Sequence, residues 1–568
     1  MREDKYVLGI GVGHNPSACL IKNGVVVSAI EQERLNRNKR SVFFNKEAID
    51  FCLKRENISM NEVKAVAFNY EFNEKILSYL DLLKNYETKK YDLLPQFHLD
   101  LLKIRKVLNK NSSKIIGVNH HESHAFQSFC LSGFDEAAAL VIDGRGEMES
   151  SSGWHFKGKE SKRLWFDSSP NSLGYLYLLI TSFLGFTYGD EYKVMGLSAY
   201  GKSIYKEKFD KLMFIEGNEI KINEKVYSDP LLNQLLFRAF WVKKKIPKKY
   251  SGSIIFDTFG EPRNSNEKIT NYHKDLAASL QAKFEELAFF LLKKLFESTK
   301  CKNLCISGGA ALNCVMAGKI TENTSFENVF IPPAPNDSGT SMGAAMKIYA
   351  EKFNDLPSHD FSVYLGPKFS GNEIACELEE QGMSYEEIDS PERTAAELTA
   401  EGNIIGWFQG EMEFGPRALG NRSILADPQR EKMKDVINEK IKFRESFRPF
   451  APTVLEEKVA DYFEQDMLSP YMSFAVRVKE EKKDKIPAVV HINNLARIHT
   501  INKKQNRKYY ELISEFEKIT GVPLVLNTSL NVKGEPIVCT PKDAINCFRK
   551  TEIDYLIMKN FMVSRGSL

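Results

Sequence analysis

Short apolar runs separated by polar turns dominate the early part of the chain and predict strands. The first three runs are Tyr6 to Ile10, Ala18 to Ile21 and Val25 to Ala29. The same pattern returns at Ala137 to Ile142, Ser151 to Phe156 and Lys162 to Phe166. Because apolar runs of four to eight residues bounded by turn residues are typical of strands, each group predicts three consecutive strands. The repetition predicts a duplicated α/β fold.

Helical periodicity becomes prominent later in the chain. Residues Lys274 to Thr299 form an amphipathic pattern that predicts a long helix. A short strand, Asn303 to Ile306, follows, and after a glycine turn a second helix is expected over Ala310 to Ile320. Helix-like segments such as Ala395 to Glu401 and Arg430 to Ile441 then alternate with strand-like ones. This alternation favours an α/β domain with a mixed sheet.

A polar stretch that contains Pro357, Ser358 and Pro367 predicts a domain boundary. At 568 residues the chain is too long for a single hydrophobic core. We therefore expect a first domain over residues 1–355, a linker over 356–367 and a second domain over 368–568.

Composition narrows the class of protein. The net charge is only +3, which argues against nucleic acid or a membrane surface as a partner. No apolar run is long enough to span a bilayer, and the polar start does not resemble a signal peptide. The nine cysteines are scattered, several within apolar segments, which is typical of reduced thiols in a cytoplasmic enzyme. We expect a cytoplasmic protein with no membrane span.

Two histidines and two aspartates are candidate metal ligands. His120 and His124 are one helical turn apart, so both imidazoles could reach one ion. Asp143 ends an apolar strand, and Asp337 follows a proline-rich loop just before an expected helix, Thr340 to Lys347. A chance histidine pair and a helix N-cap role for Asp337 are the alternatives. A set of two histidines and two aspartates suits iron(II), manganese or zinc.

Other segments suggest contacts with anions. Gly308 and Gly309 lie between a strand and an expected helix, where backbone amides can approach a phosphate; a simple tight turn is the alternative. His14 lies in a turn between the first two strands and could contact a reacting hydroxyl or phosphate. Lys39 lies in a charged segment and could neutralise charge during group transfer. Turn packing and plain solvation explain these two residues equally well.

The second domain has a different signature. Arg417 lies on a Gly-Pro turn, Arg448 lies among aromatic residues, and a third arginine, Arg497, follows Leu495-Ala496. Asn527 and Ser529 end a strand in a polar loop. Arginines on rigid turns suit bidentate binding of phosphate or carboxylate, although any one of them could form a surface ion pair. Together they favour a pocket for a small anion.

These motifs together resemble the O-carbamoyltransferases of the NodU/CmcH type. The first-domain motifs are His120-xxx-His124, Asp143-Gly144, Tyr192 to Leu197, Ser307 to Asn313 and Asn336 to Gly339. The second-domain motifs are Gly415 to Ile424, Phe447 to Pro452 and Leu526 to Asn531. The resemblance runs from Gly9 to about Asp554, which is nearly the whole chain.

The resemblance implies an actin-like ATPase-fold domain followed by a YrdC-like domain. It implies ATP, with magnesium, and carbamoyl phosphate as substrates that form carbamoyl-adenylate, whose carbamoyl group then passes to a hydroxyl of a natural product or sugar. The residues that would bind carbamoyl phosphate are Arg417, Arg448, Arg497 and Asn527. Those for adenylate formation are Lys442 and Ser529. Those for the nucleotide are Lys193, Gly308, Gly309 and Asn313.

The resemblance also places the metal and the transfer step. His120, His124, Asp143 and Asp337 would hold a divalent metal, for which we expect Fe(II) first and zinc or manganese as alternatives. His14 and Lys39 would lie beside the transferring group. Antibiotic or other natural-product biosynthesis is the expected setting. The acceptor stays open, as does a homodimer, and the irregular segment Ser203 to Asn271 is the candidate for acceptor recognition.

One motif departs from the family pattern. Around Arg497 the family usually has an Asp-Gly-Thr run before the arginine and Gln-Thr after it. This chain has Asn493-Asn494-Leu495 before it and His499-Thr500 after it, which puts the contribution of Arg497 to donor binding in question. The alternatives are a tRNA threonylcarbamoyl-transfer enzyme, an actin-like small-molecule kinase, and a nucleotide- and metal-binding regulatory protein. Release of pyrophosphate that depends on ATP and carbamoyl phosphate separates them.

Overall fold

A computed structural model describes residues 3–41, 46–71, 115–229, 231–232, 235 and 252–567. The chain forms two compact units, and the boundaries of neither unit coincide with those of a predicted domain. Unit 1 comprises Met1–Gly133 and Pro332–Leu568, and unit 2 comprises Phe134–Ile331. The predicted first domain, 1–355, therefore contributes to both units, and the boundaries at 355 and 368 stay predictions.

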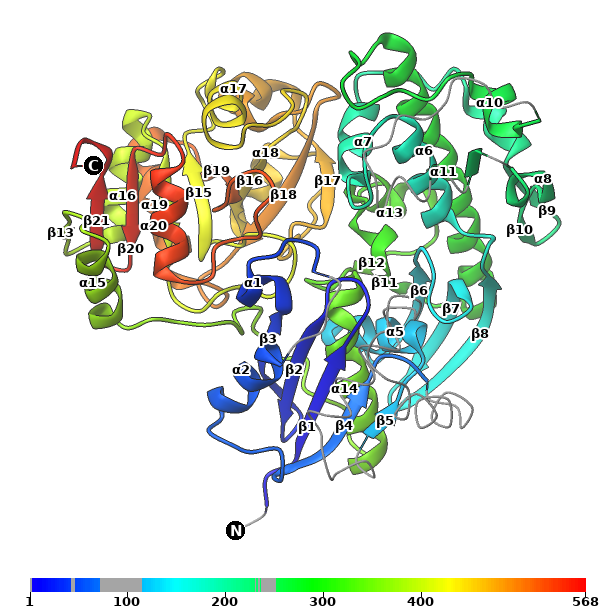
Figure 1. Cartoon of the computed structure of the whole chain (residues 1–568), viewed down its shortest axis with the longest axis horizontal. Coiled ribbons are helices and arrows are strands. Elements are labelled where there is room, and N and C mark those ends of the chain that lie inside the picture. The colour runs from blue at the N-terminus through cyan, green and yellow to red at the C-terminus, as the bar shows by residue number, and fades with distance from the viewer. Residues whose placement is uncertain are drawn as a thin grey trace, which may run out of the picture. The chain divides into compact units, whose positions relative to one another are not determined.

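In the described residues, the N-terminal part of unit 1 contains a five-stranded sheet, and helices pack with it (Figure 1). Its strands are β1 (Tyr6–Gly11), β2 (Ser17–Lys22), β3 (Val25–Glu31), β4 (Val63–Phe68) and β5 (Ile115–Gly117). Its helices are α1 (Gln32–Asn36), α2 (Glu47–Arg55), α5 (His120–Ser132) and α14 (Thr340–Phe353). The strand order is β3-β2-β1-β4-β5, with antiparallel pairs up to β1 and parallel pairs after it.

The C-terminal part of unit 1 is built on a nine-stranded mixed sheet. Its order is β13-β21-β20-β14-β15-β19-β16-β18-β17. The strands are β13 (Glu386–Glu387), β14 (Ile405–Phe408), β15 (Arg422–Ala426), β16 (Ala451–Leu455), β17 (Phe474–Arg477), β18 (Leu495–Ile501), β19 (Leu524–Ser529), β20 (Tyr555–Met558) and β21 (Phe561–Ser564). The helices are α15 (Gly371–Glu380), α16 (Pro391–Glu401), α17 (Met433–Val436), α18 (Val459–Tyr462), α19 (Arg507–Thr520) and α20 (Pro541–Arg549).

Unit 2 contains a second five-stranded sheet and a two-stranded hairpin. The strands are β6 (Glu136–Ile142), β7 (Glu149–Lys157), β8 (Glu160–Ser168), β9 (Met213–Glu216), β10 (Glu219–Ile222), β11 (Asn303–Ser307) and β12 (Asn328–Phe330). The helices are α6 (Leu173–Phe183), α7 (Glu191–Ser198), α8 (Glu224–Tyr227), α10 (Ile254–Phe259), α11 (Asn271–Thr299), α12 (Cys314–Ala317) and α13 (Ile320–Asn323).

The two five-stranded sheets share one topology, which confirms the predicted duplication. Read from its edge, the unit 2 sheet runs β8-β7-β6-β11-β12. As in unit 1, the first three strands form antiparallel pairs and the last two are added in parallel. Each half therefore consists of a three-stranded meander extended by two parallel strands, which is the predicted actin-like ATPase fold.

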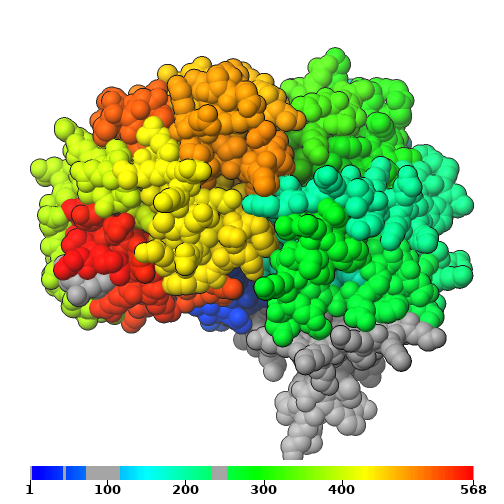
Figure 2. Space-filling view, turned by 90° about the horizontal axis from the view of Figure 1, so that it is seen from above, coloured from blue at the N-terminus to red at the C-terminus, as the bar shows by residue number. Residues whose placement is uncertain are grey.

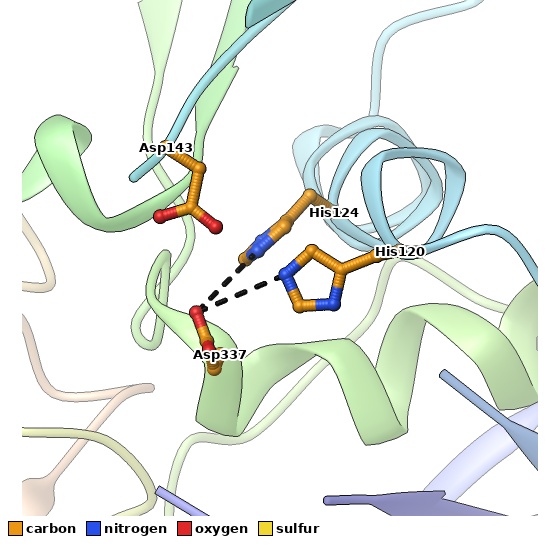
Figure 3. Close-up of side chains that lie close together, drawn as sticks. All are labelled: His120, His124, Asp143 and Asp337. Carbon is orange, nitrogen blue, oxygen red and sulfur yellow. Dashed lines mark ion pairs between the residues drawn. The ribbon is translucent and has the colours of Figure 1, made fainter. Parts of the chain in front are cut away.

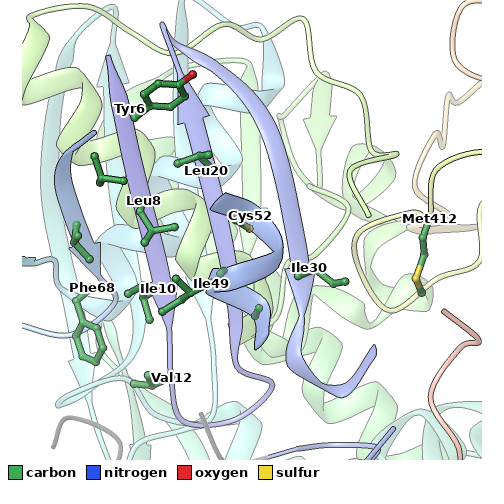
Figure 4. Close-up of a cluster of buried hydrophobic side chains, with 14 of the residues drawn as sticks. Tyr6, Leu8, Ile10, Val12, Leu20, Ile30, Ile49, Cys52, Phe68 and Met412 are labelled. Atoms are coloured by element: carbon green, nitrogen blue, oxygen red, sulfur yellow. The ribbon is translucent and has the colours of Figure 1, made fainter. Parts of the chain in front are cut away.

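A hydrophobic core joins the N-terminal sheet of unit 1 to the C-terminal part of the same unit (Figure 4). The alternating inward side chains of β1, such as Leu8 and Ile10, lie in this core together with Ile49 of α2. Met412 and Ile537, from the C-terminal part, lie in the same core. In Figure 2 the blue N-terminal segment accordingly borders yellow and orange-red C-terminal segments. Unit 1 is thus stabilised by burial of apolar surface from both ends of the chain.

Two predicted helices are wrong in extent. The segment Ala310 to Ile320 contains a 3-10 turn (Gly309–Leu312), then α12 and the start of α13. The break falls at Asn313, whose side chain caps α12 by accepting a hydrogen bond from the Met316 amide. The segment Arg430 to Ile441 contains α17 followed by a π-helical turn, Ile437–Ile441. Apolar spacing alone predicted a regular helix in both segments. A local cap interrupts the helix in the first segment, and a π-helical turn replaces it in the second. No helix of the described residues is long and apolar enough to span a membrane.

Candidate active site

The histidine pair lies in the first turns of α5, where the sequence places a strong helix start. Asn119 is the N-cap, and its side chain accepts a hydrogen bond from the Glu122 amide at 3.1 Å. His120 and His124 are fully buried, and their ring centroids are 4.8 Å apart. The predicted helical spacing of the two imidazoles is therefore confirmed.

Asp337 faces both histidines from a 3-10 turn, Asp337–Gly339, that precedes α14 (Figure 3). Its Oδ1 is 3.9 Å from Nε2 of His120 and 3.9 Å from Nε2 of His124. The ligand atoms of these three residues lie within 4.8 Å of one another. The N-cap positions of this turn and of α14 are Asn336 and Gly339, so Asp337 does not occupy the alternative N-cap position. Two buried imidazoles and one carboxylate fit a nitrogen/oxygen metal site.

Close helix packing brings these ligands together. A Cβ on Gly343 of α14 would lie 1.7 Å from the Ser123 carbonyl oxygen of α5. A Cβ on Gly339 would lie 2.0 Å from the Ala334 carbonyl oxygen. Because only glycine fits at both positions, α14 and its preceding turn approach α5 closely enough for Asp337 to face His120 and His124.

The turn that carries His14 lies beside this group. Tyr70 follows β4, and its ring centroid is 5.1 Å from that of His120. The Tyr70 hydroxyl is 3.3 Å from the position that a Cβ on Gly13 would take. Asn69 links the same region: its Oδ1 accepts from the Val12 amide, and its Nδ2 donates to Thr340 at 2.8 Å. Tyr70 was not predicted, because a lone aromatic residue after a strand carries no distinguishing pattern.

Asp143, the fourth predicted ligand, belongs to unit 2 and ends β6 as expected. Its Oδ1 accepts a hydrogen bond from the Gly309 amide at 3.2 Å. Gly308 has φ +90°, and a Cβ there would lie 2.2 Å from the Ile142 carbonyl oxygen. The glycine pair therefore packs against the end of β6 and orients the carboxylate of Asp143.

The remaining nucleotide candidates, Lys193 and Asn313, are held by structural contacts. Lys193 Nζ lies 3.1 Å from Oδ2 of Asp190. The Asn313 and Gln281 amides form two reciprocal hydrogen bonds, of 2.9 and 3.0 Å. Asn313 also caps α12, so its side chain supports the loop that contains Gly308 and Gly309.

A buried lysine lies at the end of β19. Lys442 Nζ donates to the backbone oxygens of Ser529 and Asn531 and to Oδ1 of Asn531, the last at 2.8 Å. Ser529 Oγ donates to the same Oδ1 at 2.7 Å. Burial lowers the pKa of Lys442 well below its ordinary value, and the nearby charges of Arg444, Lys39 and Arg448 act in the same direction. Lys442 and Ser529 are thus adjacent, and Asn531, for which no role was predicted, contacts both.

The donor-binding candidates Asn527 and Arg497 lie on one face of the nine-stranded sheet. Asn527 of β19 is paired with Ala451 of β16, and His499 of β18 is paired with Thr453 of β16. Because side chains two residues apart share a face, Arg497 lies on the face of His499 and one step from Ala451. Ser529 continues the same face.

Arg417 and Arg448 lie in the loops that lead to this face. Arg417 precedes Ala418, whose carbonyl oxygen accepts from Asn527 Nδ2 at 3.1 Å. Arg448 precedes β16, and its Nη1 lies 3.8 Å from Oε2 of Glu445. Both side chains are half-buried.

Lys39, predicted beside the transferring group, is electrostatically coupled to the C-terminal cluster. Burial, together with the charges of Arg40, Arg34 and Arg448, lowers the pKa of Lys39 to about 8. Lys39 in turn contributes to the lowered pKa of Lys442. The structure therefore groups Lys39 with the candidates for carbamoyl phosphate and adenylate chemistry.

A buried ion pair fixes the loop of Arg417 to the N-terminal sheet. Oε1 of Glu31 accepts from the Gly415 amide at 2.9 Å, and Arg34 Nη2 donates to the Gly415 carbonyl at 2.8 Å. Arg34 and Glu31 are themselves 3.4 Å apart. On the other side, a Cβ on Gly415 would lie 2.5 Å from the Pro333 oxygen, in the loop that leads to Asp337. Both sides of the Gly415 peptide are thus held.

The segment that departs from the family pattern before Arg497 contains a left-handed residue. Asn494 has φ +62°, a conformation that asparagine tolerates better than most residues. Arg497 keeps a regular place in β18, paired with Ala475. The segment Ser203 to Asn271 is described only in part: its residues 230, 233–234 and 236–251 lie outside the described residues.

The fold is that of a protein with a duplicated ATPase fold and an α/β domain that carries several arginines and a buried lysine. Sequence comparison gives the family. The carbamoyltransferase N-terminus family matches residues 6–346, and the carbamoyltransferase C-terminus family matches residues 396–565. The chain belongs to the carbamoyltransferase family and is a carbamoyl-transfer enzyme.

Curated relatives cover most of the chain. Nodulation protein NolNO of Sinorhizobium fredii is 36% identical over 571 residues, which is 97% of this chain and 79% of that protein. Nodulation protein U of Rhizobium tropici is 29% identical and covers 93% of this chain and 91% of that protein. An uncharacterized protein of Synechocystis is 36% identical over 99% of this chain and 97% of that protein.

Solved structures are similar only at a low level. HypF of T. kodakarensis has 13% identity and a TM-score of 0.32, over 62% of this chain and 49% of that chain. The ROK hexokinase of Thermus thermophilus has 12% identity and a TM-score of 0.31, over 61% of this chain and 100% of that chain. The fold assignment therefore depends on the strand order and the family.

Proposed function

We propose that this carbamoyltransferase uses ATP and carbamoyl phosphate to make carbamoyl-adenylate on the C-terminal sheet and then carbamoylates a hydroxyl of a sugar or natural product. The observation that carries the proposal is the buried Lys442, which contacts Ser529 and Asn531 at the end of β19. In this proposal Arg417, Arg448 and Arg497 lie on or beside the same sheet and bind anions. A buried amine among several cations is costly unless an anion is its ligand.

The activation step has two parts. Water cleaves carbamoyl phosphate to carbamate and phosphate, and a carbamate oxygen then attacks the α-phosphorus of ATP. Pyrophosphate leaves with the electron pair of the broken P–O bond. Arg417, Arg448 and Arg497 bind the donor phosphate in this scheme, while Lys442 and Ser529 face the polyphosphate. Adenylation gives the poorly electrophilic carbamate a good leaving group.

In the transfer step the acceptor oxygen attacks the carbamoyl carbon, and AMP departs with the bonding electrons. His14 lies in the turn beside Tyr70 and His120, so in this proposal its ring takes the hydroxyl proton. Lys193, Gly308 and Gly309 of unit 2, with Asn313 as support, bind the nucleotide. Backbone amides such as those of the glycine pair suit phosphate oxygens.

His120, His124 and Asp337 would hold a divalent metal, Fe(II) first with zinc or manganese as alternatives, and Asp143 completes the proposed set. When bound, the metal supplies a Lewis acid that stabilises charge on oxygen during transfer. The donor set fits such an ion because both imidazoles are buried and the Asp337 carboxylate is 3.9 Å from each.

Pyrophosphate release tests the activation step. The intact chain is incubated with ATP, magnesium and carbamoyl phosphate, and pyrophosphate is measured. We expect release that requires both substrates and falls by at least about 100-fold in Lys442→Met, the size of effect typical of a removed charge-stabilising group. Lys440→Met is the matched control, because Lys440 is half-exposed and pairs with Glu552. Absence of pyrophosphate with the wild-type chain would exclude this function.

Metal content tests the second site. We expect purified wild-type protein to hold about one equivalent of a divalent metal by elemental analysis, and His120→Ala and Asp337→Asn to lose most of it. Pyrophosphate release by these variants should persist, because the proposed activation residues lie on the C-terminal sheet. Full metal occupancy in both variants would reject these ligands.

A further inference from the structure

A buried polar network crosses the C-terminal sheet and includes His499, one of the residues at which this chain departs from the family pattern. Thr453 of β16 is at its centre, and its hydroxyl oxygen lies 3.0 Å from His499 Nδ1, 3.0 Å from Asn527 Nδ2 and 2.9 Å from the Tyr509 hydroxyl. Each of these four side chains is at most 1% exposed. Polar groups buried this deeply need defined partners.

The network fixes the orientation of the Asn527 amide. The Ala418 carbonyl can only accept a hydrogen bond, so Nδ2 must be the atom that faces it, at 3.1 Å. The second Nδ2 hydrogen goes to Thr453. Both donors of the amide are therefore used within the protein. Its Oδ1 is buried and receives no hydrogen bond from any described residue.

His499 determines which bonds Thr453 can make. The Thr453 oxygen accepts from Asn527 and from Tyr509, so its single proton must go to His499 Nδ1. This requires a neutral ring that carries its proton on Nε2. Burial lowers the pKa of His499 to about 3, against a smaller opposite effect of the Pro470 backbone, so the ring is neutral at ordinary pH.

The free oxygen of Asn527 lies where a small donor molecule would bind. The register pairs Asn527 with Ala451, and Arg497 lies one step beyond Ala451 on the same face. The loop held by Asn527 carries Arg417. A carbamoyl phosphate with its phosphate on the arginines would therefore present its NH2 group within this face.

We propose that Thr453 and His499 are positioning residues that hold the Asn527 amide with Oδ1 free to accept a hydrogen bond from the NH2 of the carbamoyl group. This inference rests on the proposed function. It assigns donor selectivity to the network: acetyl phosphate has the same phosphate and carbonyl but carries CH3 in place of NH2. A site built to bond a donor rejects an analogue that lacks it, because its buried acceptor stays unpaired.

Donor discrimination tests the network. The KM for carbamoyl phosphate and the inhibition constant of acetyl phosphate are measured in the pyrophosphate assay for wild type, Thr453→Val, Thr453→Ser, His499→Leu and His499→Gln. We expect Thr453→Val and His499→Leu to raise the KM about tenfold and to leave acetyl phosphate inhibition unchanged, as for one lost hydrogen bond. Thr453→Ser and His499→Gln keep the donor and acceptor and should stay close to wild type.

Three results would overturn the inference. Unchanged discrimination in both Thr453→Val and His499→Leu would show that the network does not orient Asn527. Equal weakening of carbamoyl phosphate and acetyl phosphate binding would show a merely structural role. If the wild-type chain is active but does not favour carbamoyl over acetyl phosphate, the Asn527 oxygen does not select the NH2. By contrast, a wild-type chain that releases no pyrophosphate fails the proposed function itself, and this inference with it.

Discussion

Lys39 shows how tertiary contacts change the chemistry of a single residue. In the sequence it is one charged residue among several, for which solvation was an equally good explanation. In the structure it is half-buried, and the charges of Arg40, Arg34 and Arg448 surround it. Desolvation and these like charges disfavour the ammonium form, which lowers its pKa to about 8. A bound phosphate would favour the charged form.

Donor affinity should therefore depend on pH. Below pH 8 the Lys39 ammonium is charged and attracts the donor phosphate, and as pH rises through about 8 the charge is lost. We expect the KM for carbamoyl phosphate to rise severalfold, up to about tenfold, between pH 7 and 9. Lys39→Arg should remove this dependence, because arginine stays charged throughout. An identical pH profile in Lys39→Arg would show that Lys39 does not bind the donor.

At the scale of elements, the metal ligands depend on how closely two helices pack. The α5 and α14 helices approach at Gly343, where a Cβ would lie 1.7 Å from the Ser123 carbonyl oxygen. That oxygen is backbone and cannot move away cheaply. The separation of His120 and His124 from Asp337 is therefore set by a glycine that carries no metal-binding chemistry.

Gly343→Ala should destabilise the protein and weaken the metal site. The added methyl group forces α14 away from α5, at a cost of about 2 kcal/mol or more in the free energy of unfolding. Urea unfolding and elemental analysis measure the two effects. The control is Gly371→Ala in α15, where a Cβ would make only ordinary contacts, the nearest at 3.6 Å. Gly343→Ala with wild-type stability and full metal content would contradict this account.

At the scale of the whole molecule, the two ends of the chain share one compact unit. Arg37, just after α1, donates to the Ile537 and Pro536 carbonyls, and Arg55 of α2 lies 3.0 Å from Glu411. The buried Glu31–Arg34 pair holds the Gly415 peptide. The C-terminal sheet and the N-terminal sheet of unit 1 are therefore parts of one folded body, although separate N-terminus and C-terminus families match them.

The buried pair should be important for stability. Arg34→Met leaves the Glu31 carboxylate buried without its partner, which typically costs about 3–5 kcal/mol. Replacing both residues, Glu31→Gln with Arg34→Met, removes the uncompensated charge and should recover part of that loss. Thermal or urea unfolding of the two variants measures the difference. A double variant less stable than Arg34→Met would show that the pair acts otherwise.

Fragments should depend on each other. Residues 1–355 expressed without 368–568 would expose the apolar core that Met412 and Ile537 help to fill. We expect each fragment alone to aggregate or to bind a hydrophobic dye, and the two to copurify when coexpressed. Two fragments that are each stable alone and do not copurify would contradict a shared core. Size-exclusion chromatography and tagged pull-down measure this.

The sequence by itself determined the elements and the chemical inventory. Apolar runs and turns identified the three antiparallel strands of each five-stranded sheet and β11, but not β4, β5 or β12. Their repetition predicted the duplication, because burial and backbone hydrogen bonding act on local pattern. The spacing of His120 and His124 follows from helix geometry alone. Ordered motifs around Arg417, Arg448 and Asn527 indicated the family.

Only the tertiary structure decided which of these residues meet and in what state. Packing of α14 on α5 brought Asp337 to the histidines, and burial shifted the pKa values of Lys39 and Lys442. Asn531 and the Thr453–His499 network could not be found from spacing, because strand pairing joins residues that are distant in sequence. Electrostatics and hydrogen-bond orientation depend on distance in space, and the order of residues does not contain that distance.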